Sequence, residues 1–448
     1  MVAAEVPMGH LATTNGDYRL LQQRLDRNVT GAPDSPVFQK ILRLLFTPDE
    51  ARIAQRIPSF IELSDLAGRV GMPVGELDRR ITEMARKGLV IDMEREGRRF
   101  VTLAPVVIGF YEFTFMRIRD EAPMEELAHL FEHYFDEGAL PHAVFRANTQ
   151  LGRSMVREEA LPADPPVEVL DWERATSVVS NADAVAVALC PCRHHARLVG
   201  RGCAAPLRTC LSFNDAADAL AGAGIAERVT NDEALEILTE SKAAGLAQTA
   251  DNVQRDVTYM CNCCGCCCGM MRSIKRFGIP HGIVTSNWIA GIDHDRCRGC
   301  GRCVKACPAD AIRLEPTHGK GLRRNWAVID SDRCLGCGVC HDACRYGAHS
   351  MEPREQRVVV PETTFDRIVA MAIERGKLGD LLFDQVEGFG PHAIARVLHV
   401  LEQTPPARAL LANEKLRSSF LRAMVAIMGR QATKLDESGR SERSGEDP

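Results

Sequence analysis

The chain has 448 residues, of which 45% are hydrophobic and 26% are charged, and its formal net charge is −5. These values are typical of a globular protein with about three domains, and they exclude a largely disordered chain or one that mainly coats nucleic acid or an anionic membrane. The apolar runs, such as 184–189, fall far short of the ~18 residues of a membrane-spanning helix, and residues 1–10 lack the pattern of a secretory signal. We therefore expect no membrane association and a cytoplasmic location.

The pattern along the chain predicts a multidomain α+β protein that begins with a loosely ordered arm over residues 1–36. Apolar spacing then predicts three short helices, of which the last begins at Pro73 and ends at Gly88, followed by two short strands around Gly97. On this order, residues 37–105 resemble the winged-helix family, which implies DNA binding. The segment carries 12 basic and 10 acidic residues, a net charge of +2. Such a charge would neutralise few phosphates, so DNA is a weakly supported partner and docking of a protein or another domain is the alternative.

Four further segments follow the winged-helix-like region. Residues 106–165 predict a helical connector whose aromatic side chains form core, and residues 166–286 predict a small α/β domain that carries cysteines. In that domain Thr230 and Glu233 form a capping box at the start of a helix. After a ferredoxin-like stretch at 287–353, residues 354–432 predict a helical C-terminal cap, and the polar residues 433–448 predict a disordered tail.

All 18 cysteines lie between Cys190 and Cys344. Disulfides that stabilise a whole secreted chain would be distributed along it, whereas both ends of this chain lack cysteine. Thiols at this density in a reducing compartment instead indicate metal binding.

Eight of the cysteines belong to a direct repeat with a period of 37 residues, in which each copy reads CxxCxxCxxxC. The first copy contains Cys297, Cys300, Cys303 and Cys307, and the second contains Cys334, Cys337, Cys340 and Cys344. This spacing resembles that of the bacterial two-cluster [4Fe-4S] ferredoxins. A pair of zinc sites is the alternative, but zinc sites rarely need this spacing twice.

The ferredoxin resemblance implies two [4Fe-4S] clusters with crossed ligation, in which the last cysteine of each copy binds the other copy's cluster. The first cluster would then be held by Cys297, Cys300, Cys303 and Cys344, and the second by Cys334, Cys337, Cys340 and Cys307. Four glycines would let the backbone approach the clusters so that amide N–H groups point at sulfur: Gly299, Gly301, Gly336 and Gly338. His349 stands where the first copy has Ile312, and we expect it to face solvent rather than to couple the cluster potential to pH.

Ten cysteines remain outside the repeat. They are Cys190, Cys192, Cys203 and Cys210, followed by Cys261, Cys263, Cys264, Cys266, Cys267 and Cys268 in the run CNCCGCCC. Adjacent free thiols would oxidise, so we expect metal ligands among them. Ten ligands suffice for two further tetrathiolate clusters, or for one unusual cluster.

The whole stretch from about residue 180 to 353 resembles a poorly characterised group of multi-cluster iron–sulfur proteins of anaerobic bacteria. In that group a CxC pair, two spaced cysteines and a CNCCxCCC run precede a ferredoxin module. The resemblance implies one or two iron–sulfur clusters beyond the ferredoxin pair, and it names no substrate. His194 and His195 follow the CxC pair as alternative ligands, although we expect them to be surface residues.

These patterns predict a soluble electron-transfer protein that relays single electrons through its clusters to a partner oxidoreductase. We expect the partner to dock near a basic flap at 308–333, which contains His318, Lys320, Arg323 and Arg324. No catalytic residue is indicated, and no dinucleotide or phosphate-binding motif accompanies the clusters. The alternatives are a redox-responsive DNA-binding regulator that uses the winged helix, and a thiol site that reduces a small molecule.

Overall fold

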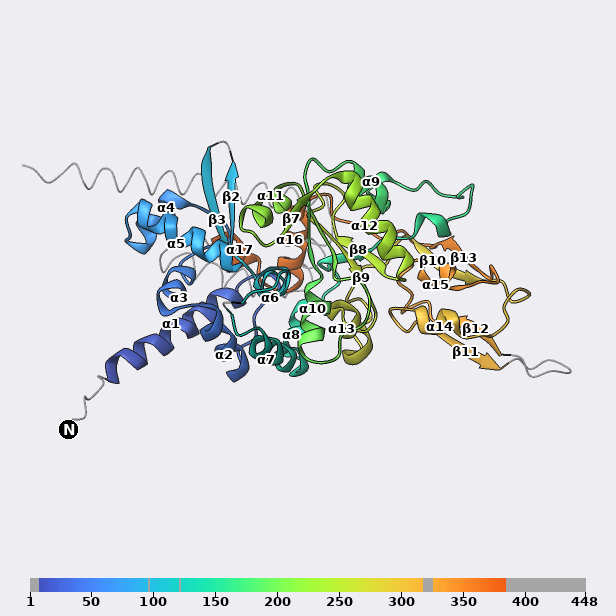
Figure 1. The fold of residues 1–448 in the computed structure, drawn as a ribbon, viewed down its shortest axis with the longest axis horizontal. Coiled ribbons are helices and arrows are strands. Elements are labelled where there is room, and N and C mark those ends of the chain that lie inside the picture. Colours follow the sequence, from blue (N-terminus) through green and yellow to red (C-terminus); the bar gives the residue numbers. More distant parts are fainter. Residues whose placement is uncertain (1–7, 96, 121, 317–324, 384–448) are drawn as a thin grey trace, which may run out of the picture. The chain divides into compact units, whose positions relative to one another are not determined.

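The computed structural model describes residues 8–383 except 96, 121 and 317–324 (Figure 1). The chain forms two units, residues 1–375 and 376–448. Helices and antiparallel sheets are both present, which confirms the α+β class. Within the described part of the chain, no helix combines the length and apolarity that a membrane crossing requires.

The N-terminal segment is helical over Met8–Asp26, so the prediction of a loosely ordered arm is wrong there, whereas residues 27–35 form turns and coil. Helix α1 (Met8–Asp26) buries Leu21 and Leu25 completely against the helices that follow it. The hydroxyl of Tyr18 donates a hydrogen bond to the carbonyl oxygen of Phe46 over 2.7 Å. The apolar residues of α1 are few and widely spaced, which is why their periodicity is weak in the sequence.

Helices and a three-stranded sheet occupy the region with the winged-helix resemblance. The helices are α2 (Pro36–Leu45), α3 (Pro48–Ala54), α4 (Leu63–Val70) and α5 (Val74–Lys87), and the strands are β1 (Ile61–Glu62), β2 (Val90–Arg95) and β3 (Arg98–Leu103). The strand order is β1-β3-β2, with all pairs antiparallel. The helix that was expected from Pro73 to Gly88 and the hairpin around Gly97 are confirmed. Membership of the winged-helix family stays a prediction.

The connector packs an aromatic core against these helices. It contains a short segment η1 (Val106–Phe110), whose backbone is non-helical at residues 107–109, and the helices α6 (Tyr111–Phe115), α7 (Met124–Asp136) and α8 (Ala139–Phe145). Phe110, Phe113 and Phe115 are buried, which confirms their prediction as core residues. Phe38 of α2 stacks on Tyr134 of α7 with ring centroids 4.7 Å apart.

A six-stranded antiparallel sheet forms the scaffold of the cysteine-rich domain. Its strands are β4 (Gly152–Ser154), β5 (Val185–Leu189), β6 (Arg208–Phe213), β7 (Glu227–Val229), β8 (Ala247–Asp251) and β9 (Tyr259–Cys263), in the order β4-β8-β9-β6-β5-β7. The sheet therefore begins at Gly152, inside the segment that was predicted to be a helical connector. Three buried residues, one of them the arginine Arg153, are too short a signal to show a strand in the sequence.

Helices between and after these strands complete the domain. They are α9 (Ala175–Ser180), α10 (Pro191–Leu198), α11 (Asn214–Gly222), α12 (Asn231–Ala243) and α13 (Gly269–Phe277), with single 3-10 turns η2 (Glu158–Ala160) and η3 (Asp171–Glu173). The predicted capping box at the start of α12 is confirmed, since Thr230 Oγ1 accepts a hydrogen bond from the Glu233 amide over 3.2 Å.

The ferredoxin-like stretch contains two strand pairs and two short helices. The elements are β10 (Trp288–Ile292), α14 (Arg302–Ala306), β11 (Ile312–Pro316), β12 (Asn325–Ile329), α15 (Val339–Ala343) and β13 (His349–Pro353). Strand β10 pairs with β13 and β11 pairs with β12, both antiparallel. Each sheet thus joins the first strand of one repeat to the last strand of the other, and Figure 1 shows α14 and α15 beside these strands.

The C-terminal prediction is only partly covered by the described residues. Helix α16 (Thr364–Glu374) lies in the first unit, and α17 (Leu378–Phe383) is the described part of the second unit. Residues 384–432 of the predicted cap and the predicted tail at 433–448 lie outside the described residues.

Candidate metal centres

Three cysteines of the second repeat surround one cavity together with a cysteine of the first repeat. Cys334, Cys337 and Cys340 line this cavity with Cys307, and the remaining walls come from Ala290, Ile312, Leu335 and neighbouring residues. Burial raises the pKa of the Cys337 thiol to about 12. A metal centre would therefore have to displace a proton there, which makes its binding pH-dependent. These are the four cysteines that crossed ligation assigns to the second cluster.

The other four ferredoxin cysteines lie around the first repeat. Cys297 and Cys344 both lie close enough to Cys303 to act on its thiol electrostatically. The last cysteine of the second repeat, Cys344, therefore lies near Cys303 of the first repeat. Burial is the main cause that raises the pKa of Cys303 to about 11. Cys300 is exposed, in contrast to the buried Cys334, Cys337 and Cys340. The first site is thus closer to solvent than the second.

Backbone amides point at sulfur in the same way in both repeats. The amide of Ala311 donates to Cys307 Sγ over 3.2 Å, and the amide of Ala348, 37 residues later, donates to Cys344 Sγ over 3.4 Å. Such N–H···S bonds help to set the potential of an iron–sulfur cluster. The two sequence repeats therefore place the same amide-to-sulfur hydrogen bond at their last cysteine.

The four glycines singled out in the repeats all adopt positive φ angles, between 61° and 78°. A Cβ atom at Gly299 would lie 2.0 Å from the Asn325 carbonyl oxygen, and one at Gly336 would lie 2.0 Å from that of Trp288. At these two positions the glycine lets a strand approach the cysteine loop, in addition to the expected approach of backbone to cluster.

We expect Gly336→Ala to disrupt the second site. The new Cβ would meet backbone, which cannot move aside, and a non-glycine residue at this φ is strained by about 1–3 kcal/mol before the clash is counted. Gly347→Ala is the matched control, because Gly347 also has a positive φ but the nearest atom to its Cβ would be the end of Arg296 at 3.8 Å. Iron content after anaerobic purification should fall in the Gly336 variant alone; equal iron in both variants would contradict this role.

Two predictions about the surroundings of the ferredoxin sites have different outcomes. His349 does not face solvent: it lies on β13 with 6% of its surface exposed, and burial lowers its pKa. The alternation along β13 places it on the inward face with Met351, a register that the sequence left open. The four basic residues of the flap, His318, Lys320, Arg323 and Arg324, lie outside the described residues.

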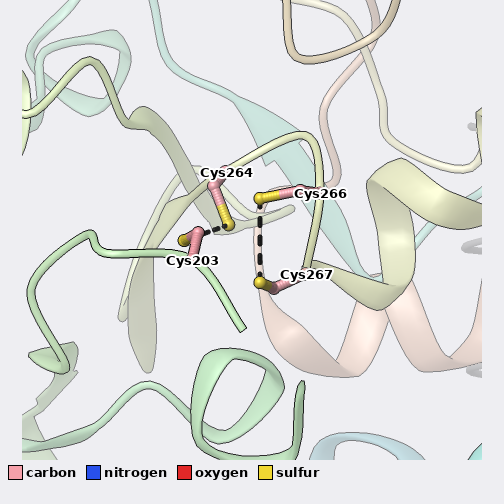
Figure 2. A group of neighbouring side chains, drawn as sticks. All are labelled: Cys203, Cys264, Cys266 and Cys267. Carbon is pink, nitrogen blue, oxygen red and sulfur yellow. Dashed lines mark hydrogen bonds between the residues drawn. The ribbon is translucent and has the colours of Figure 1, made fainter. Parts of the chain in front are cut away.

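Four of the other ten cysteines form a compact group. Cys203 comes from the loop after α10, and Cys264, Cys266 and Cys267 come from the loop between β9 and α13 (Figure 2). All four sulfur atoms lie within 4.8 Å of one another. Cys203 Sγ is 3.8 Å from Cys264 Sγ, and Cys266 Sγ is 3.7 Å from Cys267 Sγ. We call these four residues the outer cysteine group.

The remaining six, Cys190, Cys192, Cys210, Cys261, Cys263 and Cys268, form a second set that we call the inner cysteine group. Hydrogen bonds between thiols link Cys192 to Cys268 and Cys261 to Cys210. Cys268 Sγ lies 3.5 Å from Cys263 Sγ. Burial raises the pKa of the Cys190 thiol to about 12. Three thiols of the inner group are buried, those of Cys210, Cys263 and Cys268, and the other three are partly exposed.

Two helices begin at the inner group. Cys190 is the N-cap residue of α10 and Cys268 is the N-cap residue of α13. The amide of Gly269 donates to Cys192, and the amide of Met271 donates to Cys268. Free amides at a helix N-terminus favour a negatively charged thiolate, so both helix starts would stabilise a thiolate-ligated centre.

Of the two histidines after the CxC pair, His195 is buried, which corrects the prediction of a surface position for it, and His194 is partly exposed. His195 is 2% exposed; its Nε2 lies 2.8 Å from the Ala128 carbonyl oxygen and its Nδ1 lies 3.0 Å from the Tyr111 hydroxyl. His194 Nδ1 lies 2.8 Å from the Phe115 carbonyl oxygen. Both nitrogens of His195 are engaged by protein groups, so it is a structural residue and the expected alternative of metal ligation is not supported.

A carboxylate on α7 joins the two loops that carry the outer group. Glu132 accepts hydrogen bonds from Arg201, two residues before Cys203, and from Arg272 on α13, with distances of 2.7–3.1 Å. Burial alone would raise the pKa of Glu132, but the two arginines outweigh it and lower that pKa to about 2. The ionised Glu132 carboxylate therefore fixes the positions of the two loops relative to each other.

Replacing Glu132 by Gln should destabilise the protein in a pH-dependent way. Because the folded-state pKa lies below the ordinary 4.5, the ion pairs stabilise the fold fully above pH 4.5, and this contribution is lost as the pH falls toward 2. We expect a loss of roughly 2 kcal/mol at pH 7, after allowing for solvent screening. The thermal midpoints of wild type and variant should differ by a constant amount from pH 8 to 5.5 and converge below pH 4.5.

Glu126→Gln, an exposed change on the same helix, is the control and should leave the midpoint unchanged. A gap between wild type and the Glu132 variant that persists undiminished at pH 3.5 would contradict the assignment.

Comparison with known proteins supports the ferredoxin part of the chain. Residues 296–348 match the family of 4Fe-4S dicluster domains. No curated protein and no solved structure matches the chain. The matched segment contains all eight cysteines of the repeat, so this protein carries an iron–sulfur, ferredoxin-like module for electron transfer.

Sequence reasoning missed three charged residues that organise the cysteines: Glu132, Arg157 and Arg193. Arg157 is 1% exposed and Arg193 is fully buried, yet neither lies in a motif. Arg193 stands between Cys192 and His194, and its position directly after the CxC pair is the one sequence signal that could have pointed to it. Arg157 and Glu132 have no neighbouring signal, since their partners are distant in the sequence.

Proposed function

We propose that the protein relays single electrons between the two ferredoxin clusters and a third iron–sulfur cluster on the inner cysteine group, and from there or from the module to a partner oxidoreductase. The observation that carries this proposal is the contact between the second ferredoxin site and the inner group. Cys263 and Cys268 of the inner group share one buried apolar cluster with Cys337 of the second site, and Cys261 and Cys307 pack against it.

The loop with the CNCCGCCC run also contacts the ferredoxin backbone directly. A Cβ atom at Gly265 would lie 2.7 Å from the carbonyl oxygen of Pro308, the residue after Cys307. Lys275 of α13 lies 3.5 Å from a carboxylate oxygen of Asp310. The loop before α13 and α13 itself therefore both contact the ferredoxin module next to Cys307.

Arg157 fixes the ferredoxin module to the cysteine-rich domain. Its guanidinium donates to the carbonyl oxygens of Lys242 and Leu246 over 3.0 and 2.9 Å and pairs with Asp342 on α15. Its own amide donates to the Cys337 carbonyl oxygen over 3.2 Å. A buried arginine with partners on both sides supports a constant separation between the centres, which electron transfer requires.

The experiment uses the close approach at Gly265. In Gly265→Ala the new Cβ would collide with the Pro308 backbone, so the loop and the module must move apart, and electron passage from the ferredoxin clusters to the inner centre should slow by tenfold or more. The readout is rapid-freeze electron paramagnetic resonance after reduction, which follows the ferredoxin signals and any further signal separately.

Gly222→Ala is the matched control, because a Cβ at Gly222 meets no atom within 4 Å. Equal transfer rates in both variants, or the absence of any cluster signal beyond the ferredoxin pair, would contradict the relay.

For the partner we propose docking at the first ferredoxin site. Cys300 is exposed there, and Trp326 in the described part of the 308–333 segment is 36% exposed and lies against His294 with ring centroids 4.5 Å apart. Exposed aromatic residues are enriched in protein interfaces. An exposed cluster edge beside them would give a partner's redox centre a short approach.

DNA binding by the winged-helix-like region stays a prediction with less support. The C-terminal end of α5 is covered by protein: Arg119 donates to the Lys87 carbonyl oxygen over 3.3 Å, and Gly88 packs against Phe113. This contact favours the alternative interpretation, in which the region docks against the connector and the cysteine-rich domain.

A further inference from the structure

The outer cysteine group differs in size from the ferredoxin sites. Its four sulfur atoms lie within 4.8 Å of one another, and no other set of three or more ligand atoms among the described residues, the eight ferredoxin cysteines included, is as tight. In a cubane each thiolate binds a different iron, so the four sulfur atoms stand well apart. A group in which all four sulfur atoms are this close has no room for four irons between them. In the inner group, the short separation of 3.5 Å joins only one pair among six thiols.

The distances fit a single ion. Four thiolates at about 2.3 Å from a central metal in tetrahedral geometry lie about 3.8 Å from one another. Cys203 Sγ lies 3.8 Å from Cys264 Sγ, and Cys266 Sγ lies 3.7 Å from Cys267 Sγ. Figure 2 marks both contacts with dashed lines. These values also exclude disulfides, since all four cysteines are free.

The surroundings are built for a centre with negative charge. Arg193 is fully buried and lies against Cys264, with Cys190 and Cys203 also close enough to act on its charge. Its Nε–H has no acceptor among the described residues. A divalent ion with four thiolates carries two negative charges, which would pair with this buried guanidinium.

The two loops of the group are held together from outside. Glu132 binds Arg201 on one loop and Arg272 beyond the other, and Arg201 Nη1 donates to the Cys266 carbonyl oxygen over 3.4 Å. Residues 61 or more apart in the sequence thus meet in a preformed site.

We propose that Cys203, Cys264, Cys266 and Cys267 bind one divalent metal ion in a closed tetrahedral site that clasps the two loops, rather than an iron–sulfur cluster. Four thiolates leave no open position for a substrate, and zinc is the ion that such closed sites take most often. Binding releases the thiol protons and needs no redox step. The inference concerns other cysteines than the proposed relay, and its failure would leave that proposal standing.

The test compares two variants, Cys266→Ser in the outer cysteine group and Cys300→Ser in the first ferredoxin site. Both cysteines are exposed, so the two changes are matched. Zinc, iron and acid-labile sulfide are quantified in the full chain after anaerobic purification, and zinc X-ray absorption reports the first shell. We expect about one zinc per wild-type chain with four sulfur neighbours at about 2.3 Å. In Cys266→Ser the zinc should fall or lose one sulfur neighbour while iron and sulfide stay constant.

Cys300→Ser should do the reverse, losing iron and sulfide while keeping the zinc. Loss of one iron without sulfide in Cys266→Ser would equally support a single-ion site. Loss of about four irons with their sulfide would overturn the proposal, and so would unchanged metal content with an unchanged zinc shell.

Discussion

The double variant Cys307→Ala/Cys334→Ala is expected to lose no more sulfide than either single variant, about one cluster's worth. Both cysteines line the same cavity with Cys337 and Cys340, although they come from different repeats. If Cys307 and Cys334 bind the same cluster, either single substitution already removes that cluster, and the second substitution removes no other. Acid-labile sulfide in the ferredoxin module should therefore fall from about eight to about four atoms in all three variants.

The matched comparison is Cys307→Ala/Cys297→Ala, which changes two cysteines of the same repeat. Cys297 lies with Cys303 and Cys344, so this pair of changes should remove both clusters. The opposite pattern, in which Cys307 and Cys334 together abolish both clusters while Cys307 and Cys297 together abolish one, would contradict crossed ligation.

Replacing Arg193 by Met should have the second largest effect. The guanidinium is fully buried and donates to the Asn262 carbonyl oxygen over 2.9 Å and to Thr209 Oγ1 over 3.2 Å. Burial would lower the pKa of Arg193, but Cys190 and Cys264 beside it raise that pKa by more, so these two cysteines favour its charged form. Removing one partner of a buried charge pair costs about 3–5 kcal/mol.

We expect Arg193→Met to lose the metal of the cysteine-rich domain while the ferredoxin signals persist. Arg193→Lys keeps the positive charge but loses the planar guanidinium with its several N–H donors, so this variant should retain part of the metal. Arg228→Met, an exposed change on β7 away from the cysteines, is the control. Full metal content in Arg193→Met would show that the anionic centre does not depend on this cation.

The ferredoxin module could be predicted from the sequence because its spacing is local. Cys297, Cys300 and Cys303 stand at fixed offsets, and the offsets alone define a site. The prediction that His349 faces solvent was wrong, because the face of β13 on which it lies depends on the strand register. The spacing of the cysteines carries no information about that register.

The sorting of the other ten cysteines could not be predicted for the same reason. Cys264 and Cys263 are neighbours in the chain, yet one belongs to the outer group and the other to the inner group. Alternation of side chains at the end of β9 separates them, and Cys203 joins Cys264 from 61 residues away. Long-range contacts of this kind, like those of Glu132 and Arg157, leave no periodic signal in a single sequence.

The acid-labile sulfide content of anaerobically purified wild-type protein tests the central claim most directly. Two ferredoxin clusters contribute about eight sulfide atoms per chain, and a third cluster on the inner group raises the total above that value. The account predicts more than eight sulfides, with iron in a similar amount. A folded protein whose cysteines carry zinc, with no sulfide released by acid, would contradict it.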